Sequence, residues 1–117
     1  MHKDWPEMAD ELNPLIGALR KAQPDVMKGF SQMAQAALKT EALDTKTKEL
    51  IALAISVAVR CDACVTFHAK AAVREGASDQ EIAETMGMAI YMGAGPSVMY
   101  AAQTLEAVGQ WREKAAP

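Results

Sequence analysis

Residues 49–68 read ELIALAISVAVRCDACVTFH, and this stretch decides the fold. Its first half, from Leu50 to Val59, is apolar apart from Ser56. At about 100° per residue this run is apolar almost all round, which is typical of a helix that neighbours cover on several sides. The run is about half of the ~20 residues that a bilayer span requires, so we expect no membrane-spanning segment.

Capping residues, prolines and glycines divide the rest of the chain into helices, about six in all. The apolar run belongs to a helix that we expect to begin at a cap, Asp44 or Thr45, and to end at about Arg60. Before it we expect a short opening helix at Pro6, a break at Asn13-Pro14 with a second piece to about Gln23, and a helix from Pro24 to 39–42. After it we expect a helix from Cys61 to Glu75 that Gly76 terminates, and another that begins with a capping box at Ser78–Glu81. That helix should break at Gly93-Ala94-Gly95-Pro96, and a last helix should run to about Trp111.

The composition favours an all-α, single-domain protein. The chain has 117 residues, of which 23 are alanine and 8 methionine, and both are strong helix formers. Twelve Lys and Arg against fifteen Asp and Glu give a formal charge of -3, with no basic cluster for phosphates, so we expect no nucleic-acid partner. Residues 1–7 lack the basic and apolar segments of a secretory signal, and we therefore expect a cytoplasmic protein.

Three polar residues interrupt the apolar helix along one narrow stripe. Glu49, Ser56 and Arg60 fall within about 40° of one another on a helical projection. From spacing alone, the favoured interpretation is a solvated edge on which Glu49 pairs with Lys46, one turn earlier. The alternative is a carboxylate that points into a pocket.

Cys61 and Cys64 stand one helical turn apart at a helix start, and His68 follows one turn later on the same face. The two α-carbons should lie roughly 5 Å apart, inside the ~4.4 to 6.8 Å window of a disulfide. The free amide groups and partial positive charge of a helix start favour a thiolate and lower the pKa of a cysteine thiol below its usual value of about 8.5. His68 is placed to exchange a proton with Cys64.

Several kinds of site use such residues. A buried structural cysteine pair is one alternative. A structural zinc site needs four ligands, and the remaining candidates are Glu49 and the distant His2. A c-type haem requires a histidine directly after the second cysteine, where Val65 stands. A dithiol redox centre fits a C-x-x-C at a helix start best, although the usual βαβ context is missing.

Three groups of residues, taken together, resemble a known family. They are LDTKTKELI at 43–51, Arg60-Cys61-x-x-Cys64 followed by His68-Ala69-Lys70, and GASDQEI at 76–82 followed by Met92-Gly93-Ala94-Gly95-Pro96. In residue type and spacing they resemble the AhpD-like alkylhydroperoxidase core of the carboxymuconolactone decarboxylase superfamily. The resemblance covers most of the chain, with the core motifs in residues 43–100, and is weakest before Pro24 and after Tyr100.

The resemblance implies an all-helical domain over residues 1–117 that oligomerises, commonly as a trimer or hexamer, and that serves antioxidant defence. Cys64 would be the peroxidatic cysteine and Cys61 the resolving one, with His68 and Glu49 as a proton relay. The founding members are longer and carry a second histidine where this chain has Ala63, so the relay here is one member shorter. Helix-end electrostatics would favour Cys61 as the more acidic thiol, whereas His68 favours Cys64, and we follow the resemblance.

The chemistry of these residue types agrees with a thiol peroxidase. A thiolate reduces a hydroperoxide to an alcohol and becomes a sulfenic acid, which a second thiol converts to a disulfide. The chain has no Gly-rich dinucleotide fingerprint, so we expect no cofactor beyond the redox-active Cys61–Cys64 disulfide and an external reductant, a thioredoxin-like or lipoyl protein. A decarboxylase of the same superfamily and a non-catalytic helical scaffold remain the alternatives.

Methionines give a separate prediction about the helix that Ser78 opens. Its expected core face is Ile82, Met86, Ala89, Ile90 and Gly93, whereas Met88 and Met92 form a pair on another side. A solvated flexible pair is the alternative, and we favour a subunit interface, to which Tyr91, Met99 and Tyr100 would add.

Overall fold

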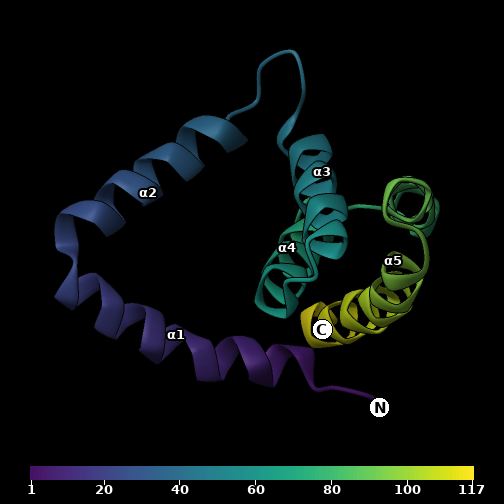
Figure 1. Cartoon of the computed structure of the whole chain (residues 1–117), viewed down its shortest axis with the longest axis horizontal. Coiled ribbons are helices and arrows are strands. Elements are labelled where there is room, and N and C mark those ends of the chain that lie inside the picture. The colour runs from purple at the N-terminus through teal and green to yellow at the C-terminus, as the bar shows by residue number, and fades with distance from the viewer.

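The structure, a computed structural model, describes residues 1–117 as five helices without any strand. They are α1 (Trp5–Ala22), α2 (Pro24–Leu38), α3 (Thr45–Ala58), α4 (Asp62–Arg74) and α5 (Asp79–Ala115). Figure 1 shows α3, α4 and α5 packed together, while α1 and α2 form an arc that leaves this body near the N-terminus and returns to it at α3. The all-α prediction is confirmed. None of the helices combines the length and apolar character that a membrane crossing requires.

Side-chain caps begin most of the helices. The Asp44 carboxylate accepts a hydrogen bond from the Thr47 amide at 2.8 Å, which settles the start of α3. At α5 the Ser78 hydroxyl accepts from the Glu81 amide, and the Glu81 carboxylate accepts from the Ser78 amide, which is the predicted capping box. Each cap satisfies amide groups that the first turn of a helix leaves without a partner.

Two helices end with a residue in the left-handed region. In α4 this residue is Gly76, with φ 80°, as predicted. In α3 it is Arg60, with φ 59°, and the following Cys61 amide donates to the Ser56 carbonyl at 3.0 Å. A side chain in this conformation costs about 1 kcal/mol, which glycine avoids. Two helices that meet at the cysteine pair are therefore joined by a turn that carries backbone strain.

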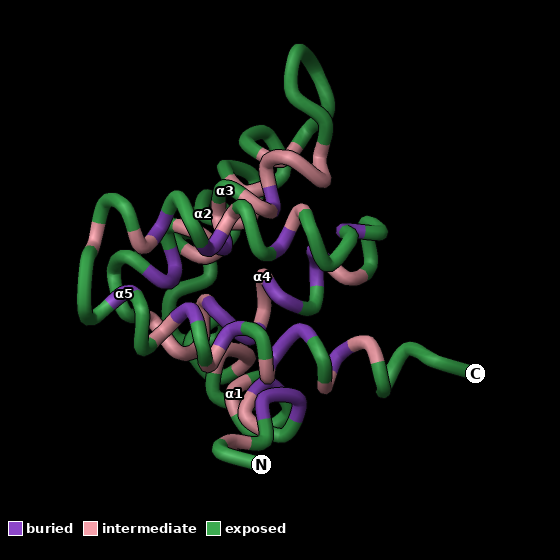
Figure 2. Tube along the Cα trace, turned by 90° about the vertical axis from the view of Figure 1, so that its right-hand side faces the viewer, coloured by how far each residue is buried: buried purple, intermediate pink, exposed green.

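The core lies between α3, α4 and α5, and the first turns of α1 close it. Figure 2 shows the buried segments concentrated in this body. Alanines occupy many of the contact positions and allow the helices to approach closely. The buried apolar cluster consists of Trp5, Ala9, Leu53, Val57, Val65, Ala69, Ala72, Ala77, Ile82, Met86, Ala89, Ala101, Ala107, Val108 and Trp111.

The predicted break at Asn13-Pro14 is wrong, because α1 runs through Pro14 without interruption. A proline inside a helix leaves the carbonyl four residues earlier without its donor. Here Pro14 and Asp10 are both exposed, so water can satisfy that carbonyl. The opening segment is therefore one helix, and the expected count of about six becomes five.

The predicted break in the Gly93–Pro96 region is present as a sharp bend inside α5. Ala94 has φ 54° and ψ -139°, outside helical values, and the chain resumes the helix directly after it. Gly93 faces Ser97 across this bend, and a Cβ at position 93 would overlap the Ser97 hydroxyl. Figure 1 shows the two halves of α5 running in different directions on either side of the bend.

The second half of α1 together with α2, residues 10–38, is called the arm here. No residue of α2 is buried, although the helix is amphipathic. Leu19, Phe30 and Met33 are half or more exposed, at 50%, 58% and 60%. Leu19 and Phe30 line an apolar groove of about 460 Å³ between α1 and α2. The arm thus presents an apolar surface that this single chain does not cover.

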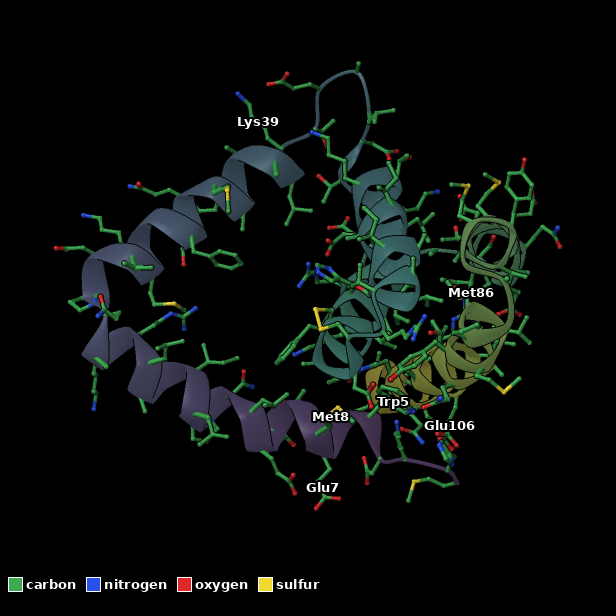
Figure 3. All side chains as sticks on the ribbon, viewed as in Figure 1. Trp5, Glu7, Met8, Lys39, Met86 and Glu106 are labelled. Atoms are coloured by element: carbon green, nitrogen blue, oxygen red, sulfur yellow. A yellow bond between two sulfur atoms is a disulfide. The ribbon has the colours of Figure 1, made fainter.

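Residues 2–5, called the N-terminal strap here, are fastened across α4 and α5. The Glu106 carboxylate accepts hydrogen bonds from the backbone amides of His2 and Lys3 and from the Trp5 indole, at 2.6, 2.9 and 2.9 Å. The two backbone bonds are the main cause that lowers the pKa of Glu106 to about 2. Figure 3 shows Trp5 and Glu106 where the start of α1 meets α5.

Acid is expected to loosen the strap. Because the pKa of Glu106 in the fold lies below the reference value of 4.5, its carboxylate stabilises the fold fully above about pH 4.5 and loses this effect as the pH falls toward 2. Glu106→Gln should therefore lower the melting temperature at pH 7, and the difference from the wild type should close toward pH 2. Glu113→Gln, at an exposed site on the same helix, is the control, and a difference independent of pH would contradict the assignment.

Candidate active site

The two cysteines form a disulfide at the first turn of α4. Cys61 is the N-cap residue, and its α-carbon lies 5.2 Å from that of Cys64, as helix geometry predicts. The Cys64 amide donates to the Cys61 sulfur at 3.2 Å. The disulfide is visible in Figure 3 as the yellow bond beside α4. Both cysteines are partly exposed.

Glu49 lies inside the protein and contacts His68. Only 2% of its surface is exposed, and its Oε1 lies 3.2 Å from Nδ1 of the imidazole. If the carboxylate is ionised it only accepts hydrogen bonds, so that Nδ1–H is then the donor and Nε2 is left to exchange a proton. The Glu49 carboxylate is buried and the His68 side chain is one-third exposed, so the contact is anchored from inside the protein at the carboxylate.

The solvated-edge interpretation of the polar stripe is therefore wrong for two of its three residues. Ser56 is buried like Glu49 and donates its hydroxyl to the Ala52 carbonyl at 2.7 Å. Lys46 does not pair with Glu49; it binds Glu81 on α5 at 2.8 Å. Spacing defines a stripe on α3, but only the packing of α4 and α5 against that stripe decides that it is buried.

The turn between α3 and α4 brings the four predicted residues to one side of the body. His68 follows Cys64 by one helical turn, so the two side chains project from the same face of α4. Glu49 reaches this face from α3, which packs along α4. All four predicted residues are thus gathered as two bonded pairs, the disulfide and the Glu49–His68 pair.

A second polar group lies at the first turn of α4, at the residue that follows Cys61, and was not predicted. The Lys3 ammonium contacts the Asp62 carboxylate at 2.6 Å, and this hydrogen bond is the main cause that lowers the pKa of Asp62. The Tyr100 hydroxyl contributes to the same effect, and Asp62 in turn raises the pKa of Tyr100. Lys3 and Tyr100 are far from the motif in sequence, so its spacing carries no signal for them.

The site offers sulfur, imidazole and carboxylate but no metal cage. No group of three or more His, Cys, Asp or Glu side chains is arranged to hold a metal ion. His2, the distant ligand candidate, is instead held in the strap by its backbone amide. A cavity of about 470 Å³ is lined by Lys70, Arg74 and Trp111 among others, near the opposite end of α4. The cysteine pair lies at the other end of α4, in a partly exposed position.

Three comparisons with known proteins place the chain. The sequence profile described as "Carboxymuconolactone decarboxylase family" matches residues 24–107. An uncharacterized protein of Cupriavidus necator is 40% identical over 105 residues, which cover 90% of this chain and 93% of that one.

Solved structures agree with this match. A carboxymuconolactone decarboxylase family protein of Legionella pneumophila has a TM-score of 0.90 and 46% identity, over 92% of this chain and 96% of that chain. A family member of Thermotoga maritima, described as a candidate for involvement in an antioxidative response, has a TM-score of 0.70 and 34% identity, over 75% of this chain and 91% of that chain. This chain belongs to the carboxymuconolactone decarboxylase family.

Proposed function

We propose that the protein is a thiol-dependent alkyl hydroperoxidase, or disulfide oxidoreductase, of antioxidant defence. The observation that carries the proposal is the buried Glu49 carboxylate bonded to His68, one turn beyond a cysteine that shares a disulfide at a helix start. A structural disulfide needs no such proton-handling pair beside it. The description of the Thermotoga maritima relative points the same way.

In the proposed reaction the Cys64 thiolate attacks the terminal oxygen of a hydroperoxide. The O–O bond breaks, the alkoxide leaves and takes a proton from His68, and Cys64 becomes a sulfenic acid. The Cys61 thiolate then attacks the Cys64 sulfur, the S–O bond breaks, and water leaves with one further proton. Glu49 holds the imidazole through Nδ1 and stabilises its protonated form during these transfers.

The resulting disulfide takes up two electrons and two protons from an external dithiol, for which we propose a thioredoxin-like or lipoyl protein. The cycle needs no bound cofactor besides the Cys61–Cys64 pair. It needs a reducing supply of dithiols, and we therefore propose a cytoplasmic location.

The test is a thiol count before and after oxidation. The protein is reduced, freed of reductant and given one equivalent of tert-butyl hydroperoxide. We expect the loss of two thiols per chain and one equivalent of tert-butanol. Unchanged thiols would contradict the proposal and leave a decarboxylase or a binding scaffold. A chain with both cysteines replaced by serine, treated in parallel, measures background decay of the peroxide.

We also propose that the chain assembles with copies of itself, as a trimer or hexamer. The arm exposes an apolar groove between α1 and α2. Ile51 and Ile55 of α3 are 44% and 56% exposed and line a further apolar groove together with Leu38 at the end of α2. A second apolar surface lies at the bend of α5, where Met88, Tyr91 and Met92 are exposed as the methionine pattern predicts. Contiguous apolar surfaces of this kind typically mark contacts between proteins.

Phe30→Glu is expected to dissociate the assembly, because it places a charge in the apolar groove of the arm. Light scattering coupled to size-exclusion chromatography should give a mass several times 12.6 kDa for the wild type and a smaller mass for the variant. Gln32→Glu adds the same charge at an exposed polar position of α2 and should leave the mass unchanged. A wild-type monomer would contradict the proposal.

A further inference from the structure

The N-terminal strap places a positive charge at the first turn of α4, where the cysteine pair stands. The Lys3 ammonium donates to Asp62 Oδ2 at 2.6 Å and to Gln103 Oε1 at 2.8 Å. Its backbone amide is held by Glu106, and its carbonyl accepts from the Gln110 side chain at 2.7 Å. Four bonds thus fix one lysine at the start of α4, which is more than a mobile surface ion pair has.

Asp62 follows Cys61 directly and stands two residues before Cys64, so its charge lies in the same first turn of α4 as the cysteine pair. A negative charge in the same helical turn disfavours a thiolate, because two like charges repel. The helix start opposes this effect with its own partial positive charge. Asp62 alone would therefore cancel part of the advantage that the helix gives to the dithiol.

We propose that Lys3 is a positioning residue of the dithiol, which neutralises Asp62 at the start of α4 and so promotes the thiolate form of the cysteine pair. The proposal rests on the redox activity of that pair. The strap would then act on the dithiol through Lys3, in addition to stabilising the fold through its contacts with α4. Lys3 acts through Asp62 and does not touch the reacting atoms.

The other charged and titratable groups at the start of α4 come from several elements and carry charges of both signs. Glu49 and His68 form their own bonded pair, and the charge of His2 adds to that of Lys3 in lowering the pKa of Asp62. The charged and titratable side chains around the start of α4 are Asp62 and His68 on α4, Glu49 on α3, Arg60 in the turn, Tyr100 on α5, and His2 and Lys3 in the strap. Lys3 is the group that binds Asp62 directly with opposite charge.

The test titrates the reduced protein by thiolate absorbance at 240 nm between pH 4 and pH 10. Lys3→Met leaves Asp62 unpaired and should raise the apparent pKa of the first thiol by about 0.5–1 unit. Asp62→Asn leaves Lys3 unpaired and should lower it by a similar amount. The double variant Lys3→Met with Asp62→Asn should return close to the wild type, because both charges are gone.

The equilibrium with dithiothreitol at pH 8 gives an independent readout. A less stable thiolate makes the reduced form less stable, so Lys3→Met should shift the equilibrium toward the oxidised protein by about threefold, and Asp62→Asn in the opposite direction. Lys3→Arg keeps the charge and should restore wild-type values. Lys46→Met removes an ion pair of nearly the same exposure, Lys46–Glu81, away from the cysteines, and should move neither readout.

Two outcomes would overturn the proposal. One is a fall in melting temperature of Lys3→Met with no change in the thiol titration, which would assign Lys3 a structural role only. The other is a shift of the same sign for Lys3→Met and Asp62→Asn. Neither readout uses a peroxide, so this proposal can fail while the peroxidase succeeds, and the peroxidase can fail while the titration behaves as expected.

Discussion

Cys64→Ser is expected to abolish the reaction with tert-butyl hydroperoxide, because serine cannot supply a thiolate at neutral pH. The remaining Cys61 thiol should survive a stoichiometric dose of peroxide. Cys61→Ser should instead react once and stop at the sulfenic acid, because the thiol that would condense with it is missing. Mass spectrometry after addition of dimedone, which traps sulfenic acids, should therefore label the Cys61→Ser protein and leave the Cys64→Ser protein unlabelled.

The opposite labelling result, with an adduct in the Cys64→Ser protein, would also have a structural explanation. The Cys61 sulfur, as the N-cap of α4, already accepts a hydrogen bond from the Cys64 amide. This favours negative charge on Cys61, whereas His68 lies one turn beyond Cys64. A dimedone adduct on Cys61 in the Cys64→Ser protein, with no adduct in the other variant, would exchange the two roles. It would leave the peroxidase proposal itself intact.

Glu49→Gln is expected to slow the oxidation of the reduced protein by hydroperoxide by about 100-fold. Glutamine retains an oxygen that can accept from Nδ1 of His68, so the side chains can stay in place. It removes the negative charge that stabilises the protonated imidazole, and the leaving alkoxide then receives its proton less readily. Stopped-flow fluorescence or timed thiol counts under pseudo-first-order conditions measure the rate.

Glu84→Gln on the exposed face of α5 removes the same charge away from the site and should react at the wild-type rate. His68→Ala is a less specific change, because it leaves the buried Glu49 carboxylate without its partner. That variant should lose stability by about 2 kcal/mol, a value reduced from that of a fully buried pair because His68 is one-third exposed. A Glu49→Gln protein that reacts as fast as the wild type would remove Glu49 from the mechanism.

Local patterns predicted the helix boundaries well where the signal lies within one turn. The capping box at Ser78–Glu81 and the terminator Gly76 were found from sequence. The cap of α3 was narrowed to Asp44 or Thr45, and the structure shows Asp44. The break at Pro14 was wrong because a proline signal is local, whereas its cost depends on whether water reaches the freed carbonyl. The left-handed Arg60 could not be predicted, since residue type argues against that conformation.

In the candidate site, too, the sequence predicted local geometry but not the contacts between helices. The Cys61–Cys64 geometry follows from helix spacing alone. Glu49 was singled out together with His68 by resemblance to a family, but spacing by itself favoured a solvated edge for Glu49 and an ion pair with Lys46. In the structure Glu49 is buried, because α4 covers the polar stripe of α3. Lys46 forms its ion pair with Glu81 of α5 and not with Glu49.

By itself, the amino-acid sequence determined that this chain is helical, where most of its helices begin and end, and that two sulfur atoms and an imidazole share one face of α4. These features depend on contacts between residues three or four positions apart. Only the tertiary structure decided that Glu49 is buried against His68, that Lys3 reaches Asp62, and that the arm is left uncovered. Those features depend on contacts between residues that are far apart in the sequence. The helical repeat shows which residues share a face of a helix, but not which other helix packs against that face.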